Sequence, residues 1–157
     1  MRFLLIDRIT SWDPGRSATA VKNVALSEDF FDDHFPLRPI MPGVLLIEGM
    51  AQLGGVLLEY GVLRDTGRKV KLVLIVVEKA KFRSFVRPGD SLEYRAEVEA
   101  VNECGGKVAA TASRDGKRVA ECTLTFGMNE SSDPALDARR AEVVSLWLQG
   151  LESDEPQ

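Results

Sequence analysis

The sequence predicts an α+β fold in which an antiparallel sheet wraps around one long helix. The first observation is an apolar run from Gly43 to Leu63, whose apolar side chains would lie on every side of a helix, as in a helix enclosed by other structure. The second is a series of strand-like runs between residues 70 and 128, separated by turn signals. A helix without a polar face needs cover on all sides, and a sheet that curves around it provides that cover.

The chain should open with two strands. Residues 2–9 and 16–25 alternate loosely between apolar and polar side chains, and the intervening "DPG" at 13–15 is a turn signal. Ser27 is followed by two acidic residues, which is the pattern of a helix start. We therefore expect a short helical turn that ends at Phe31.

A stiff loop should precede the long helix. Prolines stand at positions 36, 39 and 42, and each favours an extended backbone at the residue before it. The segment from His34 to Pro42 is therefore predicted to be a non-helical loop that can aim a side chain. The helix begins at Gly43, and the glycines further along it lower its intrinsic propensity but let neighbouring backbone approach closely.

A meander of longer strands should follow the helix. The turn signals between these strands are "RPGD", "CGG" and "DG", which connect antiparallel neighbours. The strands are expected at residues 70–82, 91–103, 107–116 and 117–128.

The last part of the chain predicts a separate amphipathic helix. Asp133 suits an N-cap, Pro134 suits the first helical position, and apolar residues then recur at three and four spacing up to Gly150. The chain thus divides into a main domain at 1–130 and a C-terminal helix with its tail at 131–157. We expect the tail after Glu152 to be disordered.

The composition excludes several classes of function. The chain has 157 residues, of which 45% are hydrophobic and 28% charged, and its formal charge of -4 argues against nucleic-acid binding. Asp7 interrupts the N-terminal apolar residues too early for a signal peptide, which favours a cytoplasmic protein. The long apolar helix could span a bilayer by length, but Glu48 and Glu59 would be costly there, so no membrane association is predicted.

No metal site and no cofactor are predicted. Cys104 and Cys122 lack CxxC spacing, and the chain has a single histidine, so the usual zinc ligand sets cannot be assembled. We interpret both cysteines as ordinary reduced residues.

His34 and Glu48 are the candidate catalytic residues. Histidine is the side chain that exchanges protons most readily near neutral pH. Glu48 would lie in the second turn of the enclosed helix, where burial favours the neutral, protonated carboxyl group. The first turn, at Gly43 and Val44, offers free backbone N–H groups that can polarise a carbonyl. A base, an acid and a polarising site suit removal of a proton next to a carbonyl with loss of a leaving group.

Both candidates also have a structural interpretation. A histidine in a proline-rich turn is more often a packing or hydrogen-bonding residue than a catalyst. An unpaired, buried glutamate is costly and therefore usually has a partner or a role. Residue types and spacing alone leave the catalytic and the structural interpretations open.

The segment "HFPLRPIMPGVLLIEGMAQLGG" resembles the signature of the 3-hydroxyacyl-[acyl-carrier-protein] dehydratases of bacterial fatty-acid synthesis. The segments "FLLIDRI", "AVKNVALSEDFFDDHFP" and "KAKFRSFVRPGDSLEYRAEV" resemble the same family, so that the similarity covers most of residues 2–126. The resemblance implies a hot-dog fold for the domain at 1–130, assembled as a homodimer or a trimer of dimers.

The resemblance also implies roles for individual residues. His34 would remove the α-proton, and Glu48 would protonate the departing 3-hydroxyl group to give a trans-2-enoyl thioester. The N–H group of Gly43 would face the thioester carbonyl, and Gln52 would help to orient the carboxyl group of Glu48. In the family the histidine and the glutamate of one site come from different protomers. Glutamate rather than aspartate at position 48 resembles the branch that dehydrates without isomerising.

The acyl chain would occupy a tunnel at the dimer interface, and an acyl carrier protein would deliver it. The basic segments 67–71 and 79–87, together with Arg38, could form a landing surface for that acidic carrier. Candidates for the tunnel wall, each of which also suits the core, are Met50, Leu53, Val56, Leu57 and Phe82.

Three departures from the family pattern keep rival activities open. The family usually has glycine where this chain has Asp33 and Leu37, and its members usually lack the C-terminal helix. A leucine resists backbone angles that glycine tolerates, so the loop could take another path or narrow the pocket mouth. The rivals are a hot-dog acyl thioesterase, against which the spacing of His34 and Glu48 argues, and a catalytically silent acyl-binding or assembly subunit.

Overall fold

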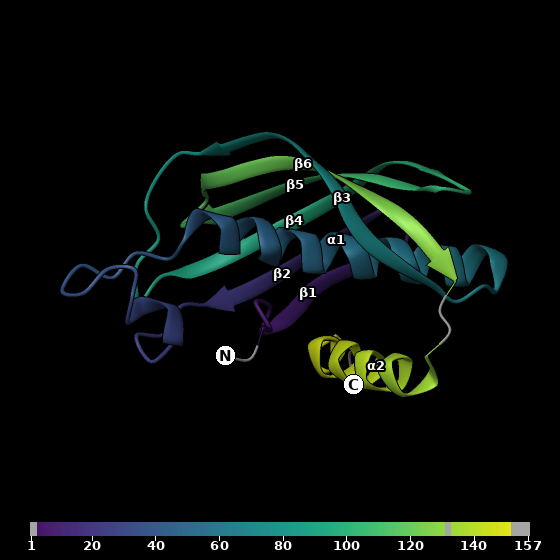
Figure 1. Ribbon diagram of the computed structural model, residues 1–157, viewed down its shortest axis with the longest axis horizontal. Coiled ribbons are helices and arrows are strands. Elements are labelled where there is room, and N and C mark those ends of the chain that lie inside the picture. The colour runs from purple at the N-terminus through teal and green to yellow at the C-terminus, as the bar shows by residue number, and fades with distance from the viewer. Residues whose placement is uncertain (1–2, 131–132, 152–157) are drawn as a thin grey trace, which may run out of the picture.

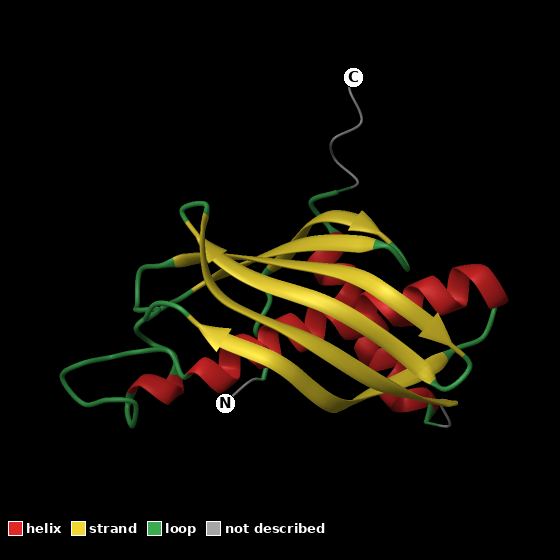
Figure 2. Cartoon of the chain, turned by 90° about the horizontal axis from the view of Figure 1, so that it is seen from above, coloured by secondary structure: helices red, strands yellow, loops and turns green. Residues whose placement is uncertain are grey.

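A six-stranded antiparallel sheet curves around one long helix in the computed structural model, which describes residues 3–130 and 133–151 (Figures 1 and 2). The strand order is β1-β2-β4-β5-β6-β3, so β1 and β3 form the two edges. This is the hot-dog arrangement that the resemblance implied. The strands are β1 Arg8–Asp13, β2 Ser17–Asn23, β3 Val70–Phe82, β4 Ser91–Asn102, β5 Gly105–Arg114 and β6 Lys117–Glu130, and the helices are the 3-10 turn η1 Asp29–Phe31, α1 Gly43–Thr66 and α2 Pro134–Leu148.

The central helix α1 is enclosed, as its apolar pattern predicted. Met50, Leu53 and Leu57 have no exposed surface, and they pack against residues of the sheet in one core. The helix ends where Gly67 adopts a left-handed conformation with φ 71° and donates its N–H to the carbonyl of Leu63. Although α1 is long and apolar enough to cross a membrane, 61% of the relevant window is buried within the chain, which makes its length weak evidence for a span.

The chain opens with a strand as predicted, but the predicted bounds at residues 2–9 were wrong. The strand β1 runs from Arg8 to Asp13, and the preceding residues 3–7 lie outside the sheet. Leu5 and Ile6 are buried, which explains the apolar pattern. The backbone N–H of Leu5 donates to the side chain of Gln52 on α1 instead of to a strand, whereas the N–H of Asp7 already donates to the carbonyl of Val21 on β2.

The turn between β1 and β2 touches α1 at a pair of glycines. A Cβ atom at Gly61 would lie 2.4 Å from the Cα atom of Gly15, which is too close for any side chain. The N–H of Gly15 also donates to the carbonyl of Leu57 at 3.0 Å. Only glycine at position 61 permits this approach of backbone to backbone.

The C-terminal helix α2 begins as predicted. Asp133 accepts hydrogen bonds from the N–H groups of Ala135 and Leu136, and Pro134 is the first helical residue. The helix lies beside β1, as Figure 1 shows, and it buries Val144 and Trp147. Leu136, which the pattern assigned to the apolar face, is exposed. The tail predicted after Glu152 lies outside the described residues.

An ion pair between a buried glutamate and a partly exposed arginine joins the two helices. Arg140 of α2 lies 2.9 Å from Glu59 of α1, and Glu59 also accepts the N–H of Leu72 at 3.0 Å. Burial raises the pKa of the Glu59 carboxyl group above its ordinary value, and the guanidinium of Arg140 and the Leu72 hydrogen bond oppose that rise. α2 therefore supplies the charge that offsets a carboxylate in the core helix.

Candidate active site

His34 is held by the loop that leads from η1 to α1. This loop projects beyond the N-terminal end of α1 (Figures 1 and 2). The His34 N–H donates to the carbonyl of Phe30, and the His34 carbonyl accepts the N–H of Ile40. The imidazole Nδ1 lies 2.7 Å from the carbonyl oxygen of Ile40. A carbonyl oxygen only accepts, so Nδ1 carries the hydrogen in the neutral ring, and Nε2 keeps the lone pair that a general base needs.

Leu37 adopts the backbone conformation in which glycine is usual. Its φ is 65°, at the third position of a turn closed by a hydrogen bond from the Arg38 N–H to the Phe35 carbonyl. The Leu37 side chain is fully exposed, and Asp33 is also exposed. The loop thus keeps a glycine-type turn despite the leucine, with the side chain directed into solvent.

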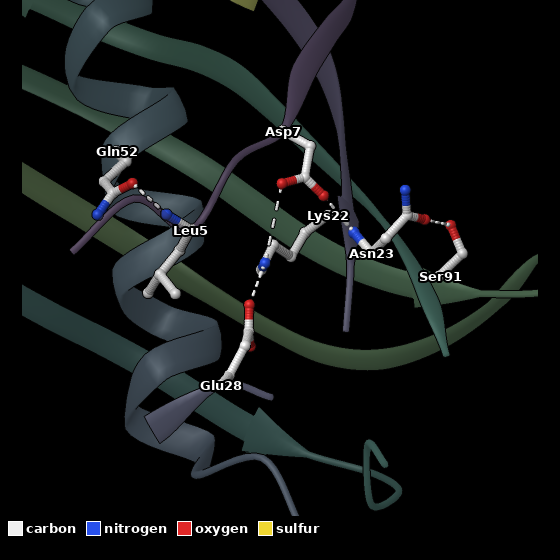
Figure 3. Close-up of polar contacts among 7 residues, drawn as sticks. All are labelled: Leu5, Asp7, Lys22, Asn23, Glu28, Gln52 and Ser91. Carbon is white, nitrogen blue, oxygen red and sulfur yellow. Dashed lines mark hydrogen bonds and ion pairs between the residues drawn. The ribbon is translucent and has the colours of Figure 1, made fainter. Parts of the chain in front are cut away.

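Glu48 lies in the second turn of α1 and contacts Gln52. The Nε2 of Gln52 donates to the Glu48 carboxylate at 3.1 Å and to the carbonyl of Phe3 at 2.8 Å. The Oε1 of Gln52 accepts the Leu5 N–H at 3.0 Å, a contact drawn in Figure 3. Because the amide oxygen is occupied by Leu5, its NH2 group must face Glu48. Glu48 itself is half-buried, less enclosed than the sequence suggested.

The first turn of α1 presents free donors. Its N-cap is Pro42, which provides no side-chain cap, and among the described residues the N–H groups of Gly43 and Val44 have no hydrogen-bond partner. The ring of Phe82, from the end of β3, covers Gly43 so closely that a Cβ atom there would lie 2.8 Å from it. Phe82 was expected in a tunnel wall, and its half-exposed ring lies next to these donors.

The structure brings some of the predicted site residues together and leaves others apart. Glu48 and Gln52 are in contact, and Gly43 and Val44 begin the same helix. In residues 3–130 and 133–151, no hydrogen bond or ion pair joins His34 to Glu48. The remaining tunnel candidates, Met50, Leu53, Val56 and Leu57, belong to the core of the single chain.

Sequence reasoning missed the partners that fix these side chains. The His34 ring donates to the backbone carbonyl of Ile40. The Gln52 amide donates to the backbone carbonyl of Phe3 and accepts from the backbone N–H of Leu5. Backbone groups are present at every position, so residue identity gives no signal for them.

A family model described as a FabA-like domain matches residues 1–123. The chain belongs to the FabA-like family. The match ends within β6, and α2 therefore lies beyond the matched part of this FabA-like chain.

Curated FabA-like relatives carry the name 3-hydroxyacyl-[acyl-carrier-protein] dehydratase FabZ. The relative from Chlamydia pneumoniae is 45% identical over 127 residues, which is 80% of this chain and 82% of its own length. One from Chlamydia trachomatis serovar L2 is 47% identical over 126 residues, 79% of this chain and 81% of its own. One from Rickettsia bellii is 38% identical over 130 residues, 83% of this chain and 88% of its own.

Solved structures with the same fold have different activities in their descriptions. The dehydratase heterocomplex ApeI:P from Xenorhabdus doucetiae superposes with a TM-score of 0.64 at 16% identity, covering 87% of this chain and 89% of that chain. A mutant thioesterase from Pseudomonas aeruginosa superposes with a TM-score of 0.61 at 19% identity, covering 79% of this chain and 81% of that chain. At such identities these neighbours establish the fold of the FabA-like chain alone.

Proposed function

We propose that this chain is a cytoplasmic, homodimeric 3-hydroxyacyl-[acyl-carrier-protein] dehydratase. It removes water from a 3-hydroxyacyl thioester on acyl carrier protein and leaves the trans-2-enoyl thioester, in fatty-acid synthesis or a related polyketide-type pathway. The observation that carries this proposal is the set of dehydratases, 38% to 47% identical to this chain, that it matches over about four fifths of its length.

In the proposed reaction His34 is the base. The Nε2 lone pair takes the α-proton of the acyl chain, and the Ile40 carbonyl stabilises the resulting imidazolium through Nδ1–H. Glu48 gives its proton to the 3-hydroxyl group as the C–O bond breaks, so that water leaves and the thioester bond stays intact. The N–H groups of Gly43 and Val44 stabilise the enolate-like charge on the thioester oxygen.

A complete site in this proposal needs two copies of the chain. Among the described residues of one chain, no hydrogen bond or ion pair joins the two catalytic side chains. The edge strand β3 supports pairing with a second copy, because it has β6 on one side and apolar side chains that are exposed in the single chain. These exposed side chains are Val73, Ile75, Val76 and Val77.

Positive charge near the helix start supports docking of an acidic carrier. A cavity of about 370 Å³ adjoins Phe82, the residue that covers Gly43, and three arginines line it. Arg114 is paired with Asp90 and Arg83 with Glu121, whereas Arg87 lies over the ring of Phe85 without a carboxylate partner among the described residues. The unpaired charge of Arg87, together with that of Arg38, fits a surface that attracts a negatively charged partner.

The test follows the absorbance of a conjugated enoyl thioester in the hydration direction. We expect wild type to remove the absorbance without releasing thiol. His34→Ala and Glu48→Gln should each lower kcat by roughly 10²–10⁴-fold, because each removes one proton-transfer group. Glu99→Gln, on the exposed surface of β4, is the matched control and should keep wild-type activity.

The rivals give different results in the same assay. Release of free thiol by wild type would identify a thioesterase. A wild type that neither hydrates nor hydrolyses short and long acyl chains would favour the silent acyl-binding subunit. Activity that survives in a folded His34→Ala variant would contradict the proposed role of His34.

A further inference from the structure

Lys22 occupies an unusual position on the inner face of β2. Its side chain is 6% exposed, and it lies on the same face of the strand as the buried Ala18 and Ala20. An ammonium group at such a position is costly unless carboxylates compensate it. We therefore expect carboxylate partners around the Lys22 ammonium group.

Two carboxylates from different segments meet at Lys22 (Figure 3). Its Nζ forms a hydrogen-bonded ion pair with Glu28 and lies 3.8 Å from Asp7. Asp7 uses its other oxygen to accept the N–H of Asn23 at 2.6 Å. Lys22 thus links two segments that lie far apart in the sequence, the residues before β1 and the residues before η1, to the inner face of β2.

The Glu28 arm leads to His34. Glu28 precedes η1, and its carbonyl accepts the N–H of Phe31 at 3.1 Å. The carbonyl of Phe30, within the same turn, accepts the N–H of His34 at 3.1 Å. The ion pair with Lys22 therefore anchors the turn from which His34 is suspended.

The Asp7 arm leads to Glu48. Asp7 lies two residues after Leu5, whose N–H fixes the amide of Gln52, and Gln52 in turn donates to Glu48. The N–H of Asp7 donates to the carbonyl of Val21 on β2 at 2.9 Å, and the side-chain contacts of Asp7 with Lys22 and Asn23 add to this backbone contact in holding the segment before β1 in place.

We infer that Lys22 is a positioning residue shared by both halves of the site: through Glu28 it sets the turn that carries His34, and through Asp7 it sets the segment that orients Gln52 and Glu48. The inference rests on the proposed roles of His34 and Glu48. Without Lys22 the Glu28 carboxylate would be left largely buried and unpaired. It could reach water only if the adjoining turn η1 moved. One oxygen of Glu28 already lacks a partner among the described residues, as does the hydroxyl of Tyr94 beside Gly49, so the cluster has little capacity to compensate.

The first test compares Lys22→Met with Lys107→Met. Lys107 also forms an ion pair on the sheet, with Glu78, but it is half-exposed and lies on β5, which does not pair with β2. We expect Lys22→Met to lower kcat by about 10-fold to 100-fold with KM changed by less than about threefold, because a small displacement of proton-transfer groups reduces the rate more than binding. Lys107→Met should leave both constants unchanged.

The two arms can be separated by a double-mutant cycle on kcat. If Asp7 acts through Gln52, the effect of Asp7→Asn disappears in a Gln52→Ala background, whereas the effect of Glu28→Gln persists there. These variants leave Lys22 in place, so they test the arms even if Lys22→Met fails to fold. Effects of Asp7→Asn and Gln52→Ala that simply add would contradict the Asp7 arm.

A spectroscopic signal makes the inference independent of turnover. His34 is the only histidine, so labelled histidine gives a single imidazole spectrum that reports its tautomer. We expect Lys22→Met and Glu28→Gln to shift the ring away from the Nδ1–H form, and Asp7→Asn to leave it unchanged. If wild type shows no dehydration but the tautomer responds in this way, the proposed function fails and the positioning by Lys22 stands. A folded Lys22→Met variant with unchanged imidazole spectrum and unchanged kcat would overturn the inference.

Discussion

At the scale of single residues, Leu37 holds a backbone angle that suits glycine. The left-handed conformation costs a leucine about 1–2 kcal/mol, and glycine loses part of that advantage through its greater freedom when unfolded. We expect Leu37→Gly to raise the free energy of unfolding by about 0.5–1 kcal/mol, measured by urea denaturation at fixed protein concentration.

The control for Leu37 is another exposed leucine. Leu26 is also exposed, but it is not among the described residues with positive φ, so Leu26→Gly should destabilise the protein slightly. If Leu37→Gly and Leu26→Gly destabilise the protein equally, the prediction that Leu37 is strained by its backbone angle is wrong.

Residue type and sequence context alone single out part of the candidate site. His34 stood out as the one histidine, and Glu48 as a carboxylate in an apolar run. Lys22 carried a comparable signal, because it shares the inner face of its strand with Ala18 and Ala20, but the alternation was used only to predict a strand. The partner of the His34 ring could not be predicted, because it is a backbone carbonyl.

At the scale of elements, the Glu59–Arg140 pair makes stability depend on pH. Burial raises the pKa of Glu59 in the folded chain above its ordinary value of 4.5, which applies to the unfolded chain. Between these two pKa values the folded chain binds more protons than the unfolded chain. Stability should therefore fall as pH rises through this window. Glu59→Gln cannot ionise and should lack this fall, which urea unfolding at a series of pH values would measure.

A variant of α2 tests the partner in this pair. Arg140→Met removes the charge that opposes the effect of burial, so it should raise the Glu59 pKa further and extend the loss of stability to higher pH. Arg139→Met is the control, because Arg139 pairs with Glu142 on the exposed face of α2. A pH profile of Arg140→Met identical to that of wild type would show that the pair does not couple α2 to the core.

Element boundaries were predicted well where caps determine them and poorly where burial imitates a strand. Asp133 and Pro134 specify the start of α2, and the structure follows them. Leu5 and Ile6 looked like part of a strand because they are apolar and buried, yet the Leu5 N–H donates to the side chain of Gln52 and not to a strand. An alternating or apolar pattern reports which residues are covered, not what covers them.

At the scale of the whole molecule, the two edges of the sheet differ. α2 lies beside β1, whereas β3 presents exposed apolar residues. If β3 pairs with a second copy, Val76→Lys should place a charge in the interface, dissociate the dimer and reduce activity in parallel. Analytical ultracentrifugation measures the first effect and the enoyl thioester assay the second.

The matched control for this prediction is Val101→Lys. Val101 is as exposed as the β3 residues but lies at the end of β4, inside the sheet order. It should leave both the mass and the activity unchanged. A Val76→Lys variant that stays dimeric would move the proposed interface away from β3.

The sequence was sufficient for the architecture but not for the assembly. An enclosed helix and a meander of strands require a wrapped sheet, and the structure has one. The fold does not select the reaction, since a dehydratase complex and a thioesterase both share it. The choice rests on His34, Glu48 and the more similar curated relatives.

The contact between Gly15 and Gly61 has a consequence at the other end of α1. An α-helix is stiff along its axis, and at 1.5 Å per residue Gly61 lies about 27 Å from Gly43. The close contact with the β1–β2 turn at Gly61 limits how far α1 can shift along its axis. It therefore helps to fix the position of the first turn of α1 relative to the loop that carries His34. The position of the proposed reaction centre along α1 thus depends on a backbone contact near the other end of the helix, far from the proposed reacting groups.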